Sequence, residues 1–323
     1  MSVKIRDIRV ICTAPEGINL VVVKIETNQP GLYGLGCATF AYRHLTVKHL
    51  IEEYMKPLLV GRPVENIEET WQLMHQNGYW RNGPIENNAI SGIDMALWDI
   101  KGKYFNVPVY QMLGGKTNES LRAYASQIQF DWDLEDKNMT SPDEYAQAAK
   151  KAMAQGYTAV KVDPVGVGAS GNWQRTNQES DWRLRGQLPN KVLELVRARV
   201  KAIRECSDDL DIIIELHSFT DTSTAIQLAN YIEDLNIMYY EEPVHPLNPV
   251  SMREIRDKIN IPIASGERIY TRLGYRPFFE NRSLSVIQPD VCLCGGISET
   301  KKICDMADTY DVKVQVHVCG GPI

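Results

Sequence analysis

The sequence lacks the features that would place the protein in a membrane, outside the cell or on a nucleic acid. No apolar run approaches the roughly 20 residues that a membrane-spanning helix needs. The N-terminal segment MSVKIRDIRV lacks the apolar centre of a signal peptide. The formal net charge is −6, and no stripe of lysine and arginine suggests a nucleic-acid partner. We therefore expect a cytoplasmic protein that binds neither membrane nor nucleic acid.

Cysteine is present, but without the spacing of a zinc site or of a disulfide framework. The chain has 7 cysteines, an odd number, and the only close pair in the sequence is Cys292-x-Cys294. Zinc sites and disulfide-rich domains show denser and more regular spacings. We expect the cysteines to be reduced thiols.

Three acidic residues end three strand-like apolar runs at equal intervals. They are Glu215, Glu241 and Glu267, and both intervals are 26 residues (241−215 and 267−241). Strands that alternate with helices in this way are typical of a β/α barrel, which gathers the carboxyl ends of its strands around one rim. Three carboxylates there would repel one another unless a hard cation such as Mg²⁺ lay between them. The alternative is that they are solvated loop residues or helix caps.

The 323 residues suit one barrel together with a smaller domain. We predict an α+β domain over residues 1–115 and the barrel over residues 116–323, with Pro108 and Gly114-Gly115 near the boundary. In the first domain we expect strands Val3–Thr13 and Asn19–Thr27, turns at Pro30-Gly31 and Gly34-x-Gly36, and helices Leu45–Leu59, Ile67–Gln76 and Ala89–Tyr104. The strands predicted for the barrel are Leu121–Ser126, Ala159–Asp163, Ile212–His217, Met238–Glu242, Ile261–Glu267, Ser285–Asp290 and Val312–His317, alternating with helices such as Pro142–Gln155, Lys191–Glu205 and Thr222–Leu235.

The sequence ends at Gly320-Gly321-Pro322-Ile323, where an eighth strand would be due. An open barrel would expose two parallel strand edges, which is an aggregation hazard. We therefore expect that this barrel lacks its C-terminal end.

One predicted connection, Pro164–Asn190, is long and rich in glycine, tryptophan and arginine. Loops of this length in compact domains are commonly active-site lids or disordered segments. Its place after a strand predicts a lid for an anionic substrate, and the alternative is a mobile insertion without a role in the chemistry. The side chains that suit a lid are Trp173, Arg175, Trp182, Arg183 and Arg185.

Further polar residues fall at the same ends of the predicted strands. Lys161 and Asp163 end one strand, and His217 follows Glu215 by two residues, so that each pair faces one side of its strand. Asp290 and His317 end neighbouring strands, which permits an Asp–His pair. A carboxylate bonded to one imidazole nitrogen fixes the tautomer and makes the other nitrogen more basic.

Several motifs resemble those of the enolase superfamily, in its mandelate racemase-like subgroup of acid-sugar dehydratases. The stretch Tyr79–Gly115 looks like the mannonate dehydratase and starvation-sensing branch, and the later motifs look closer to galactonate dehydratases. The resemblance implies a modified TIM barrel with an N-terminal α+β capping domain. The later motifs are YYEEP, ASGER, VIQPD, GGISE and VHVCGGPI.

The resemblance also implies roles for residues. It makes Glu215, Glu241 and Glu267 the Mg²⁺ ligands. Three departures stand out: the first ligand is glutamate where the family usually has aspartate, Lys161-Val162-Asp163 stands where the family has Lys-x-Lys, and the sequence ends before the eighth strand. The implied catalytic residues are His317 as base held by Asp290, His217 as acid, and Lys161 on the substrate carboxylate, and the implied substrate-binding residues are Asp163, Arg268, Arg43 and Trp80.

The function expected on this basis is Mg²⁺-dependent dehydration of an aldonate such as galactonate. The enzyme would remove the proton beside the carboxylate, pass through an enediolate and yield a 2-keto-3-deoxy sugar acid. Mannonate dehydration, racemisation or epimerisation of an acid sugar, and a catalytically weak regulatory or sensing protein remain alternatives. A homo-oligomer is expected from the resemblance.

Overall fold

The computed structural model describes residues 3–132, 138–171, 186–318 and 320–321, apart from the side chain of Glu16. The chain divides into two compact units. Unit 1 comprises Met1–Glu119, Gly266–Pro277 and Ile287–Ile323, and unit 2 comprises Ser120–Ser265 and Phe278–Val286. The predicted boundary between residues 115 and 116 stays a prediction.

Unit 1 contains an antiparallel sheet in the order β1-β2-β3, formed by β1 (Ile5–Thr13), β2 (Leu20–Thr27) and β3 (Tyr33–Cys37). Along β2, buried residues alternate strictly with more exposed ones, as expected for a sheet with one face on a core. The register places Ile8 opposite Ile25 and Val10 opposite Val23, so apolar side chains pair on the buried face.

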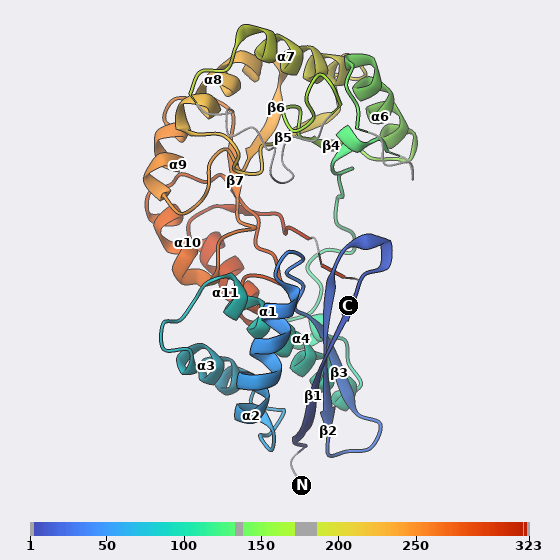
Figure 1. Ribbon diagram of the computed structural model, residues 1–323, viewed down its shortest axis with the longest axis vertical. Coiled ribbons are helices and arrows are strands. Elements are labelled where there is room, and N and C mark those ends of the chain that lie inside the picture. The colour runs from blue at the N-terminus through green and yellow to red at the C-terminus, as the bar shows by residue number, and fades with distance from the viewer. Residues whose placement is uncertain (1–2, 133–137, 172–185, 319, 322–323) are drawn as a thin grey trace. The chain divides into compact units, whose positions relative to one another are not determined.

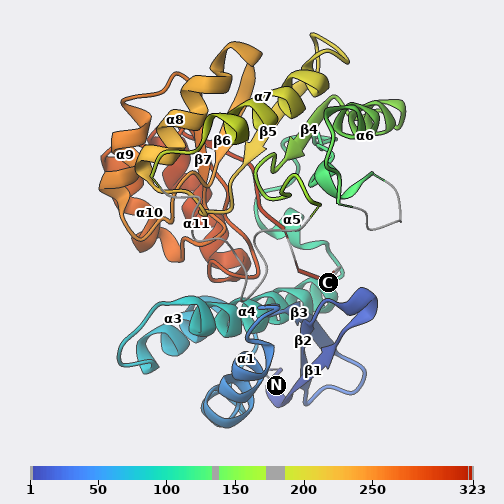
Figure 2. The same ribbon diagram turned by 45° about the horizontal axis from the view of Figure 1, so that its top comes forward.

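Helix α4 (Pro84–Phe105) covers this sheet, as Figures 1 and 2 show. The predicted turn at Gly34-x-Gly36 is wrong, because both glycines lie within β3. Their role is close packing: a Cβ at Gly34 would collide with the Ala96 carbonyl, and one at Gly36 with the Gly92 carbonyl. Glycine here lets the strand and helix backbones touch.

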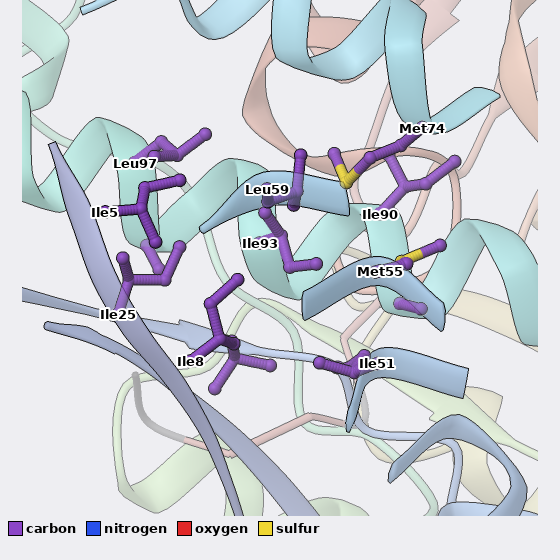
Figure 3. Packing of buried hydrophobic residues seen from close by; sticks show 14 of the residues in the cluster. Ile5, Ile8, Ile25, Ile51, Met55, Leu59, Met74, Ile90, Ile93 and Leu97 are labelled. Carbon is purple, nitrogen blue, oxygen red and sulfur yellow. The ribbon is translucent and has the colours of Figure 1, made fainter. Parts of the chain in front are cut away.

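Several other helices of unit 1 complete a buried apolar core, seen in Figure 3. Ile8 of the sheet lies between Ile93 of α4 and Ile51, while Ile25 lies beside Ile5. Full burial of such a side chain contributes about 1.5–3 kcal/mol. The elements that complete this core are α1 (His44–Leu50), a π-helical segment (Ile51–Met55), α2 (Lys56–Leu59) and α3 (Ile67–Asn77). Unit 1 also contains α5 (Val109–Met112), α11 (Gly296–Thr309) and the short strand β9 (Lys313–Val314), and α10 (Thr271–Glu280) crosses the division between the units.

Unit 2 alternates strands and helices around a parallel sheet. All four residues of β4 are buried, and so are the last four of β5, which is typical of strands covered on both faces. In Figures 1 and 2 the helices of this unit flank its strands. The elements are β4 (Ala159–Val162), β5 (Asp211–Glu215), β6 (Ile237–Glu241), β7 (Ile263–Ser265) and Val286 of β8 (Val286–Ile287), with α6 (Pro142–Ala154), α7 (Asn190–Arg204), α8 (Thr222–Ile232) and α9 (Pro249–Arg256).

The strands near the predicted rim are shorter than the sequence suggests. Glu267, Asp290 and His317 all follow their strands rather than end them. Directly after β7, the backbone of Gly266 crosses so close to Gln288 that a Cβ there would lie 2.5 Å from the backbone nitrogen of Gln288. The predicted strand Leu121–Ser126 is wrong, because it is reduced to one bridge between Ala125 and Val160.

Residues 172–185 of the predicted lid lie outside the described residues, and with them Trp173, Arg175, Trp182, Arg183 and Arg185. Among the helices that the structure describes, none is long and apolar enough to cross a membrane.

Candidate active site

Two glutamates end neighbouring strands of unit 2. Glu215 closes β5 and Glu241 closes β6, and the two are direct partners in the parallel register. Both side chains are buried. Lys161 reaches across from β4, with its Nζ atom 2.6 Å from Glu241 Oε1 and 3.3 Å from Glu215 Oε2. The sequence predicted that these three side chains gather at one edge, and the structure places them there.

The charges of this cluster depend on one another. Burial alone would lower the pKa of Lys161, but the carboxylates of Glu241 and Glu215 outweigh burial and hold that pKa well above its ordinary value. Burial raises the pKa of Glu241 to about 8, the neighbouring Glu215 adds to the rise, and Lys161 opposes it. The Oε2 atom of Glu241 is buried and has no hydrogen-bond partner among the described residues. A buried, unpartnered carboxylate oxygen of high proton affinity suits a cation.

His217 lies just beyond β5 on a left-handed backbone, with φ of 48°. Its Nδ1 atom is 2.9 Å from Asp163 Oδ2, and its backbone N–H donates to Glu215 Oε1 at 2.7 Å. Asp163 is fully buried, and its other oxygen accepts backbone N–H groups of Val165 and Gly166. Asp163 therefore orients His217, a contact that its predicted role in substrate binding did not include.

Two glutamines complete this group, and the sequence analysis missed them. Gln127 Nε2 lies 3.3 Å from His217 Nε2. Gln129 donates to Gln127 Oε1 and accepts the backbone N–H of Asp163 at 3.2 Å. The sequence did offer a sign of them, because two glutamines stand two residues apart just after the predicted strand Leu121–Ser126. The left-handed backbone of Gln127, with φ of 59°, was not predictable from sequence.

Unit 1 holds the second histidine. His317 Nδ1 is 2.7 Å from Asp290 Oδ2, and an isolated parallel bridge joins the backbones of the two residues. His317 Nε2 is 3.2 Å from Glu267 Oε2, while Glu267 Oε1 is 3.2 Å from a guanidinium nitrogen of Arg268. The structure thus brings the predicted Asp–His pair together with Glu267 and Arg268.

The two predicted substrate-binding residues of the N-terminal region are surface residues of unit 1. Arg43 precedes α1 and donates to the Tyr42 carbonyl at 2.7 Å. Trp80 is 90% exposed, and its ring packs edge-to-face on the ring of Tyr79, with the ring centroids 5.3 Å apart. Their roles remain predictions.

In chemical terms, the chain offers an acidic pair suited to a cation and two histidines, each with Nδ1 held by a buried aspartate. In both histidines, Nε2 is then the atom that can exchange a proton with a substrate.

Two domain families match most of the chain. Residues 2–114 match the mandelate racemase / muconate lactonizing enzyme N-terminal domain, and residues 144–323 match the enolase C-terminal domain-like family. The chain belongs to the enolase superfamily. The resemblance inferred from the motifs is therefore confirmed.

Curated relatives of this enolase-superfamily chain carry the name of one family. A D-galactonate dehydratase family member from Enterococcus gallinarum is 33% identical over 313 residues, which is 97% of this chain and 75% of the relative. One from Musicola paradisiaca is 36% identical over 325 residues, covering 98% of this chain and 78% of the relative. The chain is accordingly an enzyme, a lyase of the dehydratase kind.

Solved structures agree. A member of the enolase superfamily from Salmonella Typhimurium is 49% identical with a TM-score of 0.94, covering 99% of this chain and 82% of that one. An enolase from Pantoea ananatis, with bound D-gluconate and Mg, is 32% identical with a TM-score of 0.84, covering 98% and 78% of the two chains. The predicted fold class, a modified TIM barrel with an N-terminal α+β capping domain, is confirmed by this match.

Proposed function

We propose that this dehydratase removes water from an acid sugar, an aldonate such as galactonate, and releases a 2-keto-3-deoxy sugar acid. The observation that carries the proposal is the presence of two histidines, each held at Nδ1 by a buried aspartate. Dehydration breaks two bonds, one to hydrogen at C2 and one to oxygen at C3, so it needs one base and one acid. The names of the relatives and the D-gluconate in a related structure support the choice of substrate.

We propose Glu215, Glu241 and Glu267 as ligands of one Mg²⁺. The donor set consists of carboxylates alone, which Mg²⁺ prefers. The unpartnered Oε2 atom of Glu241 fits this assignment, and so does the bound Mg of the Pantoea ananatis structure. Glu267 follows β7, the strand that pairs with β6, by two residues. When bound, the ion would polarise the substrate carboxylate and stabilise the negative charge that develops on its oxygens.

His317 is the proposed base. Since Asp290 accepts the Nδ1–H, Nε2 is the nitrogen that takes the C2 proton, and Asp290 then stabilises the imidazolium. Lys161 would bind the substrate carboxylate and also balance the charge of Glu215 and Glu241. Arg268, Arg43 and Trp80 are proposed to contact the substrate away from the reacting carbons.

His217 is the proposed acid. Its Nε2 atom would donate a proton to the departing C3 hydroxyl, which leaves as water. Asp163 would act through His217, by holding Nδ1 and stabilising the charged ring. Gln127 would keep Nε2 pointed away from the aspartate.

A second candidate, epimerisation at C2, is favoured by one observation. An epimerase needs a base on each face of the reacting carbon, and Asp163 gives His217 the same support that Asp290 gives His317. The two reactions differ in outcome, because an epimerase keeps the C3 hydroxyl.

The decisive experiment screens an acid-sugar library, including galactonate, gluconate and mannonate, with Mg²⁺ in D₂O. We expect semicarbazide-reactive 2-keto products from one or a few substrates. Solvent deuterium at C2 of an inverted substrate, without a 2-keto product, would assign epimerisation instead. If no acid sugar exchanges its C2 proton with metal-loaded protein, the proposed acid-sugar substrate and the proposed mechanism are wrong.

We also propose that the enzyme is cytoplasmic and homo-oligomeric. Light scattering on the purified full chain would measure its mass in solution, and a monomer at every concentration would contradict the second part.

A further inference from the structure

Two cysteines far apart in the sequence lie in one buried cluster of unit 1. Cys37 is the last residue of β3, and Cys292 follows Asp290 by two residues. Both pack with Met95, and they are 1% and 8% exposed. Neither residue has a part in the proposed reaction.

The Cys37 sulfur makes two hydrogen-bond contacts with described residues, one with a hydroxyl group and one with a backbone N–H that donates to it. Thr39 Oγ1 lies 3.1 Å from it, and the backbone N–H of Gly321 donates to it at 3.4 Å. The Cys292 thiol contributes most to lowering the pKa of Cys37 to about 6, and burial opposes this. The lowered pKa favours the thiolate of Cys37, which is the nucleophilic form of cysteine, next to the Cys292 sulfur.

The backbone of Gly320 lies against both sulfurs. A Cβ at that position would be 2.7 Å from Cys292 Sγ and 3.2 Å from Cys37 Sγ. The two sulfurs are thus covered by one glycine and lie close enough for small movements to join them.

The same pair adjoins the Asp290–His317 pair. The backbone N–H of Cys292 donates to Asp290 Oδ1 at 2.7 Å, while Asp290 Oδ2 holds His317 Nδ1. Gly320 follows His317 by three residues. A change at the sulfurs therefore acts on chain segments that position both members of the pair.

We propose that Cys37 and Cys292 are a modification site that forms a reversible disulfide on exposure to a hydroperoxide, and that this bond displaces the Asp290–His317 pair. The second part rests on the proposed function. It would make the dehydratase sensitive to oxidants.

The chemistry balances with the hydroperoxide as oxidant. The Cys37 thiolate attacks the terminal oxygen of the hydroperoxide and the O–O bond breaks, which gives Cys37 sulfenic acid and an alkoxide, or hydroxide from hydrogen peroxide. The leaving anion takes a proton from solvent and departs as an alcohol or as water. The Cys292 sulfur then attacks the Cys37 sulfur, the S–O bond breaks, and hydroxide leaves with the thiol proton as water. Two thiols lose two electrons in total, and a dithiol reductant restores them.

The first test maps disulfides in the full chain after treatment with hydrogen peroxide, blocking of free thiols and digestion. We expect a Cys37–Cys292 cross-linked peptide that dithiothreitol removes. In Cys292→Ser, Cys37 should instead be trapped as sulfenic acid by dimedone, whereas Cys12→Ser, a matched control in β1, should still form the bond. The proposal is wrong if both cysteines stay reduced while others oxidise, or if the cross-link joins other cysteines.

The second test follows His317 without depending on turnover. The Nδ1–H proton resonance of His317, assigned by its loss in His317→Asn, should shift on oxidation and return with dithiothreitol. Where the protein shows dehydration or C2 exchange, the rate should fall reversibly by at least about tenfold, since a positioned base contributes about 10²–10⁴-fold. Cys292→Ser should be insensitive in both measurements. A mapped disulfide with an unmoved resonance would refute the coupling, and absent turnover would count against the proposed function alone.

Discussion

His217 and His317 each have an aspartate next to Nδ1, but the groups next to their Nε2 atoms differ. Asp163 holds His217 in unit 2, and Asp290 holds His317 in unit 1, at 2.9 and 2.7 Å. The Nε2 atom of His217 lies near the neutral amide of Gln127, whereas that of His317 lies 3.2 Å from the Glu267 carboxylate.

This difference predicts which histidine would respond to Mg²⁺ at the proposed ligands. Glu267 is a proposed Mg²⁺ ligand, so metal loading changes the charge next to His317 Nε2. His217 contacts one proposed ligand, Glu215, through its backbone N–H, which donates to Glu215 Oε1. We therefore expect His317 to govern proton removal at the carbon beside the carboxylate, and His217 to govern a separate bond.

The largest effect is expected from His317→Asn. If His317 is the base, this change removes C2 proton exchange and dehydration together, each by roughly 10²–10⁴-fold. Asp290→Asn should reproduce part of the loss, because an amide can favour the wrong tautomer of His317. Exchange followed by NMR in D₂O, and product by semicarbazide, measure the two steps. Full dehydratase activity in His317→Asn would assign the base elsewhere.

The next largest effect is expected on Mg²⁺ binding by the proposed ligands. Glu215→Gln should weaken Mg²⁺ binding by roughly 10–100-fold or more, since even supporting residues of metal sites contribute that much. Glu242→Gln is the matched control, because Glu242 is equally buried but bonds to Ser218 and Ser265. Calorimetric titration with Mg²⁺, alongside thermal unfolding to confirm folding, provides the measurement. Equal losses in both variants would remove Glu215 from the metal site.

A smaller and more selective effect is expected at the second histidine. His217→Asn should lower dehydration by roughly 10²-fold, the lower end for an acid catalyst, while C2 exchange stays detectable. The reason is that the enediolate still forms at His317 and returns to substrate. Measuring both rates in one reaction separates the roles. Loss of exchange to the same extent as dehydration would show that the two histidines do not divide the reaction as proposed.

Much of this arrangement could be predicted from the sequence, because it follows from strand order. Glu215 and Glu241 end adjacent parallel strands, and buried apolar runs before them make those strands recognisable. The same reasoning from strand ends predicted that Lys161 lies near these two glutamates. It failed where a residue's backbone leaves the strand: Gln127 and His217 both have positive φ, so alternation along a strand could not show their contact.

Close packing was the other limit. Gly34 and Gly36 have the composition of a turn, yet they lie in a strand because α4 needs the space that a side chain would fill. The partner of Cys37 was hidden for a similar reason, since it lies far along the chain and is reached through packing alone. Local sequence patterns do not indicate such tertiary contacts.

The smallest effect tests what a buried aspartate does without an imidazole partner. Asp94 of α4 accepts the Ser298 backbone N–H at 3.0 Å and the Ser298 hydroxyl at 2.5 Å. Burial raises the pKa of Asp94 to about 7 from its ordinary 3.8, although the bonds from Ser298 oppose the rise. The carboxyl group of Asp94 is therefore expected to keep its proton over much of the acidic range.

The sign of the pH effect follows from linkage. Between about pH 4 and 7 the folded state retains a proton at Asp94 that the unfolded state has lost, so this stabilisation is fully present below the unfolded pKa and disappears as pH rises through the folded value. Asp94→Asn removes the titration and keeps the shape. The free energy of unfolding of the wild type, measured by urea denaturation relative to Asp94→Asn, should fall by about 1–3 kcal/mol from pH 4 to pH 7. A difference that stays constant or rises over this range would mean that Asp94 is ionised in the folded protein.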